Sequence, residues 1–317
     1  NFNYFPLPMR RPFSLPTLFS LARIIKSVQP DILHSHSSVD SWLVAITGKL
    51  LGVPIVRSRH VNIPMRNHIF NRWLYAKAPK RILTSGRGIA EMVSERSGLS
   101  ADKIISIPAG VDFRIFDYKI SGDKIRQELG ISSHQPLIGI VGVIRGWKGY
   151  DYFVDSAPLV LEKFPDARFV IVGAGPGYEA ILSKIKNQGL ERSVFMLGHR
   201  EDIPEIMAAL DVHCVASFAV EGTTQVIPQA FAMKTPVVST RIGSILPILG
   251  NGERGILVAL KDSQDLAKGI MQFLDNPNLV QDMTEKAYAF SKKELSTDKM
   301  MEQTISVYQE VLNESHP

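Results

Sequence analysis

The chain has 317 residues, 45% hydrophobic and 21% charged, which is the balance of a globular protein long enough for two domains. Its single cysteine, Cys214, excludes an internal disulfide and suits a reducing compartment. No apolar run approaches the roughly 18 residues that a membrane-spanning helix needs, and the start shows no signal peptide.

The net charge of +5 is divided unevenly along the chain. Residues 1–115 carry 16 Lys and Arg against 6 Asp and Glu, whereas the rest of the chain has an acidic surplus. A basic half favours an acidic partner, and an anionic membrane surface or a phosphorylated lipid-linked substrate would fit. A merely solvated surface is the alternative. We expect no nucleic-acid partner, because the sequence has no zinc pattern, RNP-like aromatic motif or basic helix with heptads.

Helices and strands alternate through the first part of the chain. In order, the periodicity predicts helix 14–29, strand 31–34, helix 42–51, strand 54–57, helix 67–76, strand 81–84, helix 89–96 and strand 103–107. Ser14 is the expected cap of the first helix, and Gly52 the expected stop of the second. This spacing is typical of parallel βαβ units.

A polar stretch over 116–135, with one short helix, is the predicted junction. Beyond it we predict strands at 137–141, 168–172, 194–197, 212–215 and 237–239, and terminal helices at 265–274, 280–292 and 297–312. The expected fold is α/β, with two doubly wound units and a cleft between them. The predicted domains are 1–118, 119–295 and a last helical segment, 296–317, that packs back on the first domain.

The first unit shows about four strands and begins with a helix. A doubly wound domain usually begins with a strand and a glycine-rich turn. We therefore expect a βαβ segment upstream of Asn1, so that the first domain is truncated. The absence of an initiator Met agrees with a fragment.

Two glycine-containing loops follow predicted strands. In Gly173–Gly177 the third glycine of a dinucleotide fingerprint is replaced by Tyr178, so we interpret the loop as a tight strand-to-helix turn. The loop 141–149 places Gly142, Arg145 and Lys148 ahead of a helix, where cations and backbone amides favour a diphosphate. A solvated basic turn is the alternative for this second loop.

Polar side chains also end two strands of the first half. His34 and His36 follow one strand, and Arg59 and His60 follow the next, where α/β sheets place ligands. No Asp-x-Asp and no His/Cys cluster with metal-ligand spacing occurs, so we expect no bound metal and no cofactor. Cys214 lies in an apolar strand and is predicted to be a core residue.

The stretch EGTTQVIPQAFAMKTPVVST, residues 221–240, places a carboxylate before Gly-Thr-Thr at the end of a predicted strand. Together with DILHSH (31–36), IPAGVD (107–112), VGAGP (172–176) and LGHREDIP (197–204), it falls in the order seen in family 4 glycosyltransferases. The chain resembles these enzymes over nearly its whole length. The resemblance implies a GT-B fold and a retaining, metal-independent glycosyltransferase.

The resemblance assigns roles around the 221–240 stretch. Glu221 matches the family residue that positions the donor sugar and stabilises positive charge at C1. Gly222, Thr223 and Thr224 would supply amides near the sugar and the β-phosphate. Gln229 stands where the family has a second Glu for the ribose hydroxyls, and an amide can accept from one hydroxyl and donate to the other.

Further roles follow from the other motifs. Lys148 matches a family lysine at the diphosphate, Val143 stands where the family has an arginine, and Arg145 is expected to substitute for it. His36 matches a family histidine near the donor sugar and acceptor. We assign the nucleobase region to His199 and Arg200, and the acceptor region to Arg59 and His60.

These observations predict a glycosyltransferase that uses a UDP- or GDP-type sugar and a glycan or lipid-linked acceptor. The expected location is the cytoplasm, at the inner face of the membrane, with an acceptor of the cell-envelope or lipopolysaccharide kind. Two alternatives stay open: a nucleotide-sugar 2-epimerase of the same fold, and a non-catalytic nucleotide-sugar-binding subunit.

Overall fold

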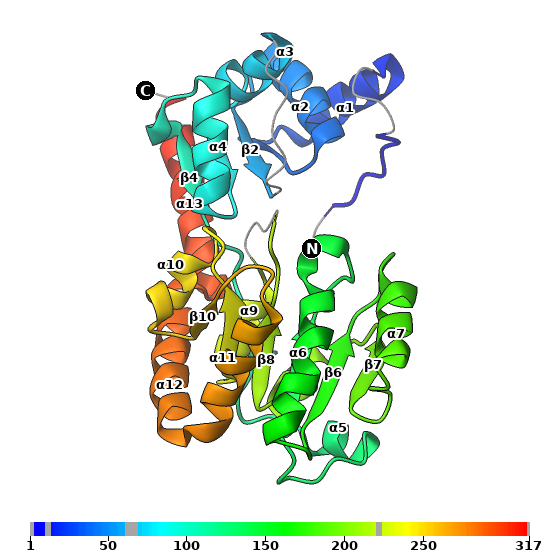
Figure 1. Ribbon diagram of the computed structural model, residues 1–317. Coiled ribbons are helices and arrows are strands. Elements are labelled where there is room, and N and C mark those ends of the chain that lie inside the picture. Colours follow the sequence, from blue (N-terminus) through cyan, green and yellow to red (C-terminus); the bar gives the residue numbers. More distant parts are fainter. Residues whose placement is uncertain (1–2, 10–13, 61–68, 220–223, 316–317) are drawn as a thin grey trace. The chain divides into compact units, whose positions relative to one another are not determined.

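The structure, a computed structural model, describes residues 3–9, 14–60, 69–219 and 224–315. The chain forms two compact units: residues 1–108 with 300–317, and residues 109–299. Each unit contains one sheet whose paired strands all run parallel, flanked by helices (Figure 1). The sequence placed the domain boundary at 118 and began the last segment at 296, whereas the units divide at 108 and at 299.

The first unit has a four-stranded sheet in the order β1-β2-β3-β4. Its elements are α1 (Leu15–Val28), β1 (Leu33–Ser35), α2 (Ser38–Leu51), β2 (Ile55–Arg59), α3 (Ile69–Arg72), the π-helical η1 (Trp73–Lys77), β3 (Arg81–Thr84), α4 (Arg87–Ser97), the 3-10 turn η2 (Ala101–Lys103), β4 (Ile104–Ser106) and most of α13 (Thr297–Asn313).

Local sequence explains where the first helices begin and end. The Ser14 hydroxyl accepts from Thr17 N, which confirms the predicted cap of α1. Helix α2 begins four residues earlier than predicted, because Ser37 and Asp40 form a capping box. Gly52 ends α2 in the left-handed conformation at φ 73°, as expected.

Side chains alternate along β2 and so reach both faces of the first sheet. Ile55 joins the core formed with α1 and α2, whereas Val56 packs with Val307 and Val311 of α13. The last helix therefore covers one face of this sheet, and the helices that precede β1 to β4 cover the other.

The second unit has a six-stranded sheet in the order β10-β9-β8-β5-β6-β7. Its elements are α5 (Asp123–Glu128), β5 (Leu137–Val141), η3 (Gly146–Lys148), α6 (Tyr150–Lys163), β6 (Arg168–Val172), α7 (Tyr178–Asn187), β7 (Val194–Gly198), α8 (Ile203–Ala209), β8 (Val212–Val215), α9 (Val226–Ala232), β9 (Val237–Thr240), α10 (Leu246–Leu249), η4 (Gly250–Gly252), β10 (Ile256–Val258), α11 (Ser263–Asp275) and α12 (Pro277–Glu294).

Two apolar layers enclose the second sheet. One contains Phe153 of α6, Ile181 of α7 and Phe273 of α11, and the predicted core residue Cys214 is fully buried in it. The other contains residues of α5, α8, α9 and α12. The result is the predicted doubly wound arrangement, a helix–sheet–helix sandwich.

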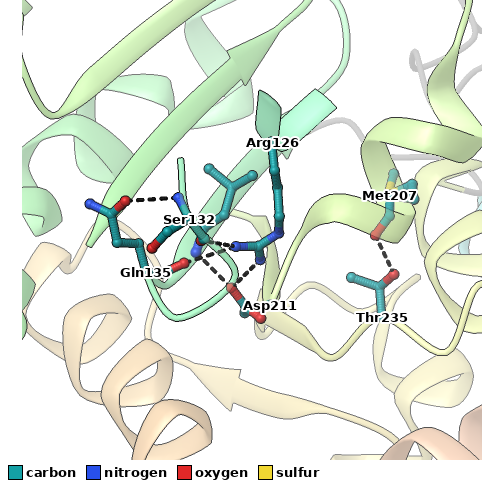
Figure 2. Close-up of polar contacts among 7 residues, drawn as sticks. Arg126, Ser132, Gln135, Met207, Asp211 and Thr235 are labelled. Atoms are coloured by element: carbon teal, nitrogen blue, oxygen red, sulfur yellow. Dashed lines mark hydrogen bonds and ion pairs between the residues drawn. The ribbon is translucent and has the colours of Figure 1, made fainter. Parts of the chain in front are cut away.

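A network of hydrogen bonds and one ion pair lies at the amino-terminal edge of this sheet (Figure 2). The Arg126 guanidinium lies 2.6 Å from Asp211 Oδ2 and also donates to the carbonyls of Ser132 and Gln135. The same Asp211 oxygen accepts from Leu137 N at 2.7 Å. This network joins the loop before β5 to the start of β8, at the edge opposite to the one where ligands bind in such sheets.

Candidate functional site

The order of the second sheet identifies one point at which a ligand is expected. From β5 the chain continues outward through β6 and β7, then returns to place β8 on the other side of β5. Loops at the carboxyl ends of β5 and β8 diverge at this switch point, where open α/β sheets bind ligands. A small cavity lies there, lined by Val141, Lys148, Ser217, Thr224 and neighbouring residues.

Two glycines allow the loops at this edge to approach each other. A Cβ on Gly149 would lie 2.0 Å from the Ala216 carbonyl oxygen, and Gly149 has φ 74°. A Cβ on Gly173 would lie 1.9 Å from the Gly142 oxygen. Only glycine fits such positions. The 173–177 loop runs directly from β6 into α7, as the predicted tight turn requires.

The structure brings two of the predicted diphosphate residues, Lys148 and Thr224, to one cavity. Lys148 ends the η3 turn, and Gly149 leads from it into α6, a helix of 14 residues. The amino end of such a helix carries partial positive charge, which adds to that of the lysine ammonium group. The electrostatic field at this edge of the sheet therefore favours an anion.

The other residues predicted in this loop take different positions. Arg145 is exposed, with its guanidinium carbon 5.3 Å from the centre of the Trp147 ring. The Gly142 amide donates to Val172 O at 2.9 Å, so a phosphate could not use this amide. Gly142 thus serves the packing of the loops, and its assignment to the diphosphate stays a prediction.

Helix α9 carries the predicted ribose residue. Gln229 is the fourth residue of α9 and is half-buried. Glu221, Gly222 and Thr223, predicted at the donor sugar and β-phosphate, lie outside the described residues. Just before α9, the Gln225 amide donates to Gly110 O at 3.1 Å, a contact that the sequence did not predict.

Gly110 belongs to the segment IPAGVD, whose structural role is now visible. Its position leaves no room for a Cβ, which would lie 2.6 Å from Thr297 Cα. Val111 N donates to Leu295 O, and Thr297 N donates to Val111 O. The segment that follows the first sheet is thus hydrogen-bonded to Leu295 and to the first residue of α13.

The predicted nucleobase residues follow β7. His199 is exposed, whereas Arg200 forms ion pairs with Glu128 at 2.6 Å and Asp202 at 2.7 Å. Hydrogen bonds to Asp202 and then Glu128 raise the pKa of Arg200. Its guanidinium is held within the protein, and a nucleobase role for these two residues stays a prediction.

Within the first unit, three histidines line a cavity of about 290 Å³. His34 Nδ1 lies 2.5 Å from the Tyr308 hydroxyl, and His34 Nε2 lies 2.8 Å from Ser58 Oγ. His36 Nδ1 lies 3.3 Å from His60 Nε2, and these two rings are nearly parallel at 2°. The structure thus brings together the histidines of two strand ends.

The wall of this cavity that carries the histidines differs in polarity from the wall formed by α13. Burial lowers the pKa of His34 to about 4, so that its ring is neutral at pH 7. Burial and then the neighbouring His36 lower the pKa of His60. The opposite wall comes from α13 and is largely apolar, with Met300, Met301 and Ile305. Tyr308 was missed because it stands 274 residues from its partner.

Arg59, predicted beside His60 in the acceptor region, is half-buried and donates to the Tyr75 hydroxyl. Alternation along an extended strand directs Arg59 and His60 to opposite faces. The two side chains therefore have different surroundings. Of the two, only His60 lines the three-histidine cavity.

Two further features are absent from the described residues. In residues 3–9, 14–60, 69–219 and 224–315, no group of three or more His, Cys, Asp or Glu could hold a metal ion. Within the same part of the chain, no helix is long and apolar enough to cross a membrane.

Two family models match the chain. Residues 121–290 match the glycosyl transferases group 1, and residues 2–114 match glycosyltransferase family 4. The UDP-Gal:alpha-D-GlcNAc-diphosphoundecaprenol alpha-1,3-galactosyltransferase of Escherichia coli is 28% identical, over 83% of this chain and 71% of that protein. The D-inositol 3-phosphate glycosyltransferase of Corynebacterium aurimucosum is 25% identical, over 82% of this chain and 66% of that protein.

Solved structures give the same result for the fold. A glycosyltransferase from Rickettsia africae matches with a TM-score of 0.87 at 21% identity, over 98% of this chain and 84% of that one. Anabaena HepE in complex with UDP-glucose matches with a TM-score of 0.79 at 21% identity, over 93% of this chain and 82% of that one. The predicted GT-B class is confirmed.

Proposed function

The chain belongs to the glycosyl transferases group 1, and from that premise we propose that it moves a sugar from a nucleotide diphosphate sugar to a glycan or lipid-linked acceptor. The observation that carries the donor half is the cavity at the switch point, where Lys148 and Thr224 meet at the start of α6. The names of the E. coli relative and of the HepE complex, which state UDP-Gal and UDP-glucose, favour a donor of the UDP type.

The donor site acts by stabilising negative charge on the departing group. The bond between C1 of the sugar and the β-phosphate oxygen breaks, so negative charge grows on the departing nucleoside diphosphate. The Lys148 ammonium group and the amino end of α6 stabilise that charge without reorganising. Arg145, on the same turn, adds a second cation from the exposed side. These groups let the reaction proceed without a bound metal ion.

The sugar itself develops positive charge at C1, as in glycoside hydrolysis. Glu221 is the proposed group that positions the sugar and favours this charge, and Gln229 the group that binds ribose. We propose retention of the anomeric configuration, as in family 4 glycosyltransferases.

The three-histidine cavity is the proposed acceptor subsite in the first unit. The neutral His34 ring is fixed by Ser58 and Tyr308, and it lies 4.1 Å from the ring of His36. His36 and His60 present ring nitrogens that can donate to or accept from sugar hydroxyls. Met301 and Ile305, each about half exposed, offer an apolar wall to the carbon face of a sugar or to a lipid.

The basic surplus of residues 1–115 supports a location at the inner face of the cytoplasmic membrane. A lipid-linked or lipopolysaccharide-type acceptor would be met there. The lipopolysaccharide core mannosyltransferase LpsB of Rhizobium meliloti, 24% identical over 89% of this chain, supports an acceptor of this class.

The test is a screen of UDP-, GDP- and ADP-sugars for protection of the full chain against thermal unfolding, because a bound ligand stabilises the native state. We expect one UDP- or GDP-sugar to raise the Tm, and EDTA to leave this effect unchanged. Protection by none of the nucleotide sugars would contradict the donor site. Product analysis by NMR with the selected donor then decides retention.

A further inference from the structure

A second basic feature of the first unit lies on the other face of its sheet from the three-histidine cavity. Arg57 is only 5% exposed, in the middle of β2. Its guanidinium carbon lies 3.8 Å from the centre of the Tyr75 ring, and Nη2 lies 2.9 Å from the Tyr75 hydroxyl. Nη1 lies 3.5 Å from Leu74 O. Every one of these partners is neutral.

The charge of Arg57 is therefore not balanced within the part of the chain that the structure describes. Among those residues, Nε has no hydrogen-bond partner, and no carboxylate lies within ion-pair distance of the guanidinium. Burial lowers the pKa of Arg57, but an arginine side chain stays protonated in proteins. A buried cation without a neighbouring anion destabilises the native state. An anion from outside would remove this destabilisation.

The carboxylate of Asp40 interacts with Arg57 electrostatically but is committed elsewhere. Its oxygens accept from the backbone amides of His36 at 2.9 Å and Ser37 at 2.8 and 3.0 Å, where they cap α2. Among the described residues no ion pair joins Asp40 to the Arg57 guanidinium, so this carboxylate acts on Arg57 only from a distance. Asp40 therefore does not neutralise the positive charge of Arg57.

Arg59 extends this charge toward the surface. It follows Arg57 by two residues, on the same face of β2, and donates to the same Tyr75 hydroxyl. Arg59 is half-buried, so it joins the enclosed Arg57 to solvent. A planar guanidinium group can donate two parallel hydrogen bonds, which matches the oxygens of a phosphate.

We propose that Arg57 and Arg59 form an anion site for a phosphate or diphosphate group that the acceptor itself carries. This rests on the proposed glycosyl transfer and adds the chemical class of its acceptor. The names of two relatives, a diphosphoundecaprenol galactosyltransferase and an inositol 3-phosphate glycosyltransferase, show that phosphate-bearing acceptors occur among similar proteins. The acceptor is thus anchored by its phosphate on β2.

Calorimetric titration of the full chain tests the site. Inorganic pyrophosphate is titrated into protein that is saturated with UDP, so that the donor site does not contribute. The variants are Arg59→Gln and, as a control that removes the same charge from the same unit, Arg23→Gln, an exposed residue of α1. We expect Arg59→Gln to weaken pyrophosphate binding at least tenfold and Arg23→Gln to change it less than twofold. Equal affinities in both variants, or no binding by the unmodified chain, would overturn the site.

A second arm identifies the source of the phosphate. Polyprenyl diphosphate and phosphatidylglycerol are compared in non-ionic detergent micelles. Arg59→Gln should weaken only the binding of polyprenyl diphosphate; an equal loss with phosphatidylglycerol would assign the site to a bilayer headgroup and refute an acceptor site. Failure of UDP itself to bind would refute the donor site, while the response of pyrophosphate to Arg59→Gln would still decide the arginine site.

Arg57 offers an independent check through thermal unfolding. Arg57→Met removes the buried charge and keeps an apolar stem, so the variant should gain no Tm from pyrophosphate, whereas the unmodified chain should. Equal gains would show that Arg57 does not face the anion. If Arg57→Met fails to fold, Arg59→Gln carries the decision.

Discussion

His213 should make the second unit sensitive to acid. It lies in β8 between Gly139 of β5 and Val237 of β9, and its side chain is wholly buried. Burial lowers the pKa of this imidazole from 6.5 to about 4. In the unfolded chain the ring is solvated and titrates near its ordinary value of about 6.5.

The sign and size of the effect follow from this difference. Between pH 6.5 and 4 the unfolded chain binds the proton and the native state does not, so acid favours unfolding. The stabilising contribution is complete above pH 6.5 and is lost as the pH falls toward 4. The difference corresponds to about 3 kcal/mol of unfolding free energy in total, of which about 2 kcal/mol is lost by pH 5.

Denaturant unfolding at pH 7.5 and pH 5.0 measures this loss in the chain and in His213→Gln. Trp147 reports on the second unit when Trp42 and Trp73, which stack in the first unit, are replaced by Phe. Between the two pH values the parent should lose about 2 kcal/mol more than His213→Gln, since all other titrations are shared. Equal losses of unfolding free energy in the two proteins would refute the assignment of this acid sensitivity to His213.

Three further changes test the site and its surroundings. Lys148→Ala should weaken UDP binding by about 1.5–3 kcal/mol in calorimetric titration, because a charged hydrogen bond is lost, and an unchanged Kd would remove Lys148 from the site. Gly149→Ala should lower the Tm and abolish UDP binding, since its Cβ would lie 2.0 Å from Ala216 O; normal binding would show that the loops need not approach so closely. Arg126→Ala should lower the unfolding free energy by about 1–2 kcal/mol in denaturant titration while UDP affinity stays constant, because the pair with Asp211 lies at the opposite edge of the sheet.

Elements buried on both faces could be predicted well from the sequence. Strands 81–84, 137–141 and 168–172 are found at the predicted residues, because apolar and β-branched side chains predominate in each of them. Strand β10 was not predicted, since three residues, Ile256–Val258, show no alternation. Within the described residues, the helix predicted over 67–76 is α-helical over Ile69–Arg72 and π-helical over Trp73–Lys77, a change without a local signal.

Some residues of the candidate sites could likewise be predicted from the sequence, and others could not. Lys148 and Thr224 could be placed because each follows a strand end, and strand ends of one parallel sheet meet at one edge. Tyr308 could not, because its contact with His34 depends on where the last helix packs. Arg57 was passed over as an ordinary strand residue, although two arginines spaced by two in a buried strand were the signal.

Glycosyl transfer from a nucleotide sugar through the Lys148 site is the central claim, and acceptor-dependent turnover tests it most directly. UDP release and acceptor glycosylation are measured for the full chain and for Lys148→Ala, each with and without a lipid-linked acceptor. We predict stoichiometric UDP and glycosylated acceptor only when the acceptor is present, and at least a tenfold lower kcat/KM in Lys148→Ala. Release of UDP that is independent of acceptor, or equal rates in the two proteins, would contradict the claim.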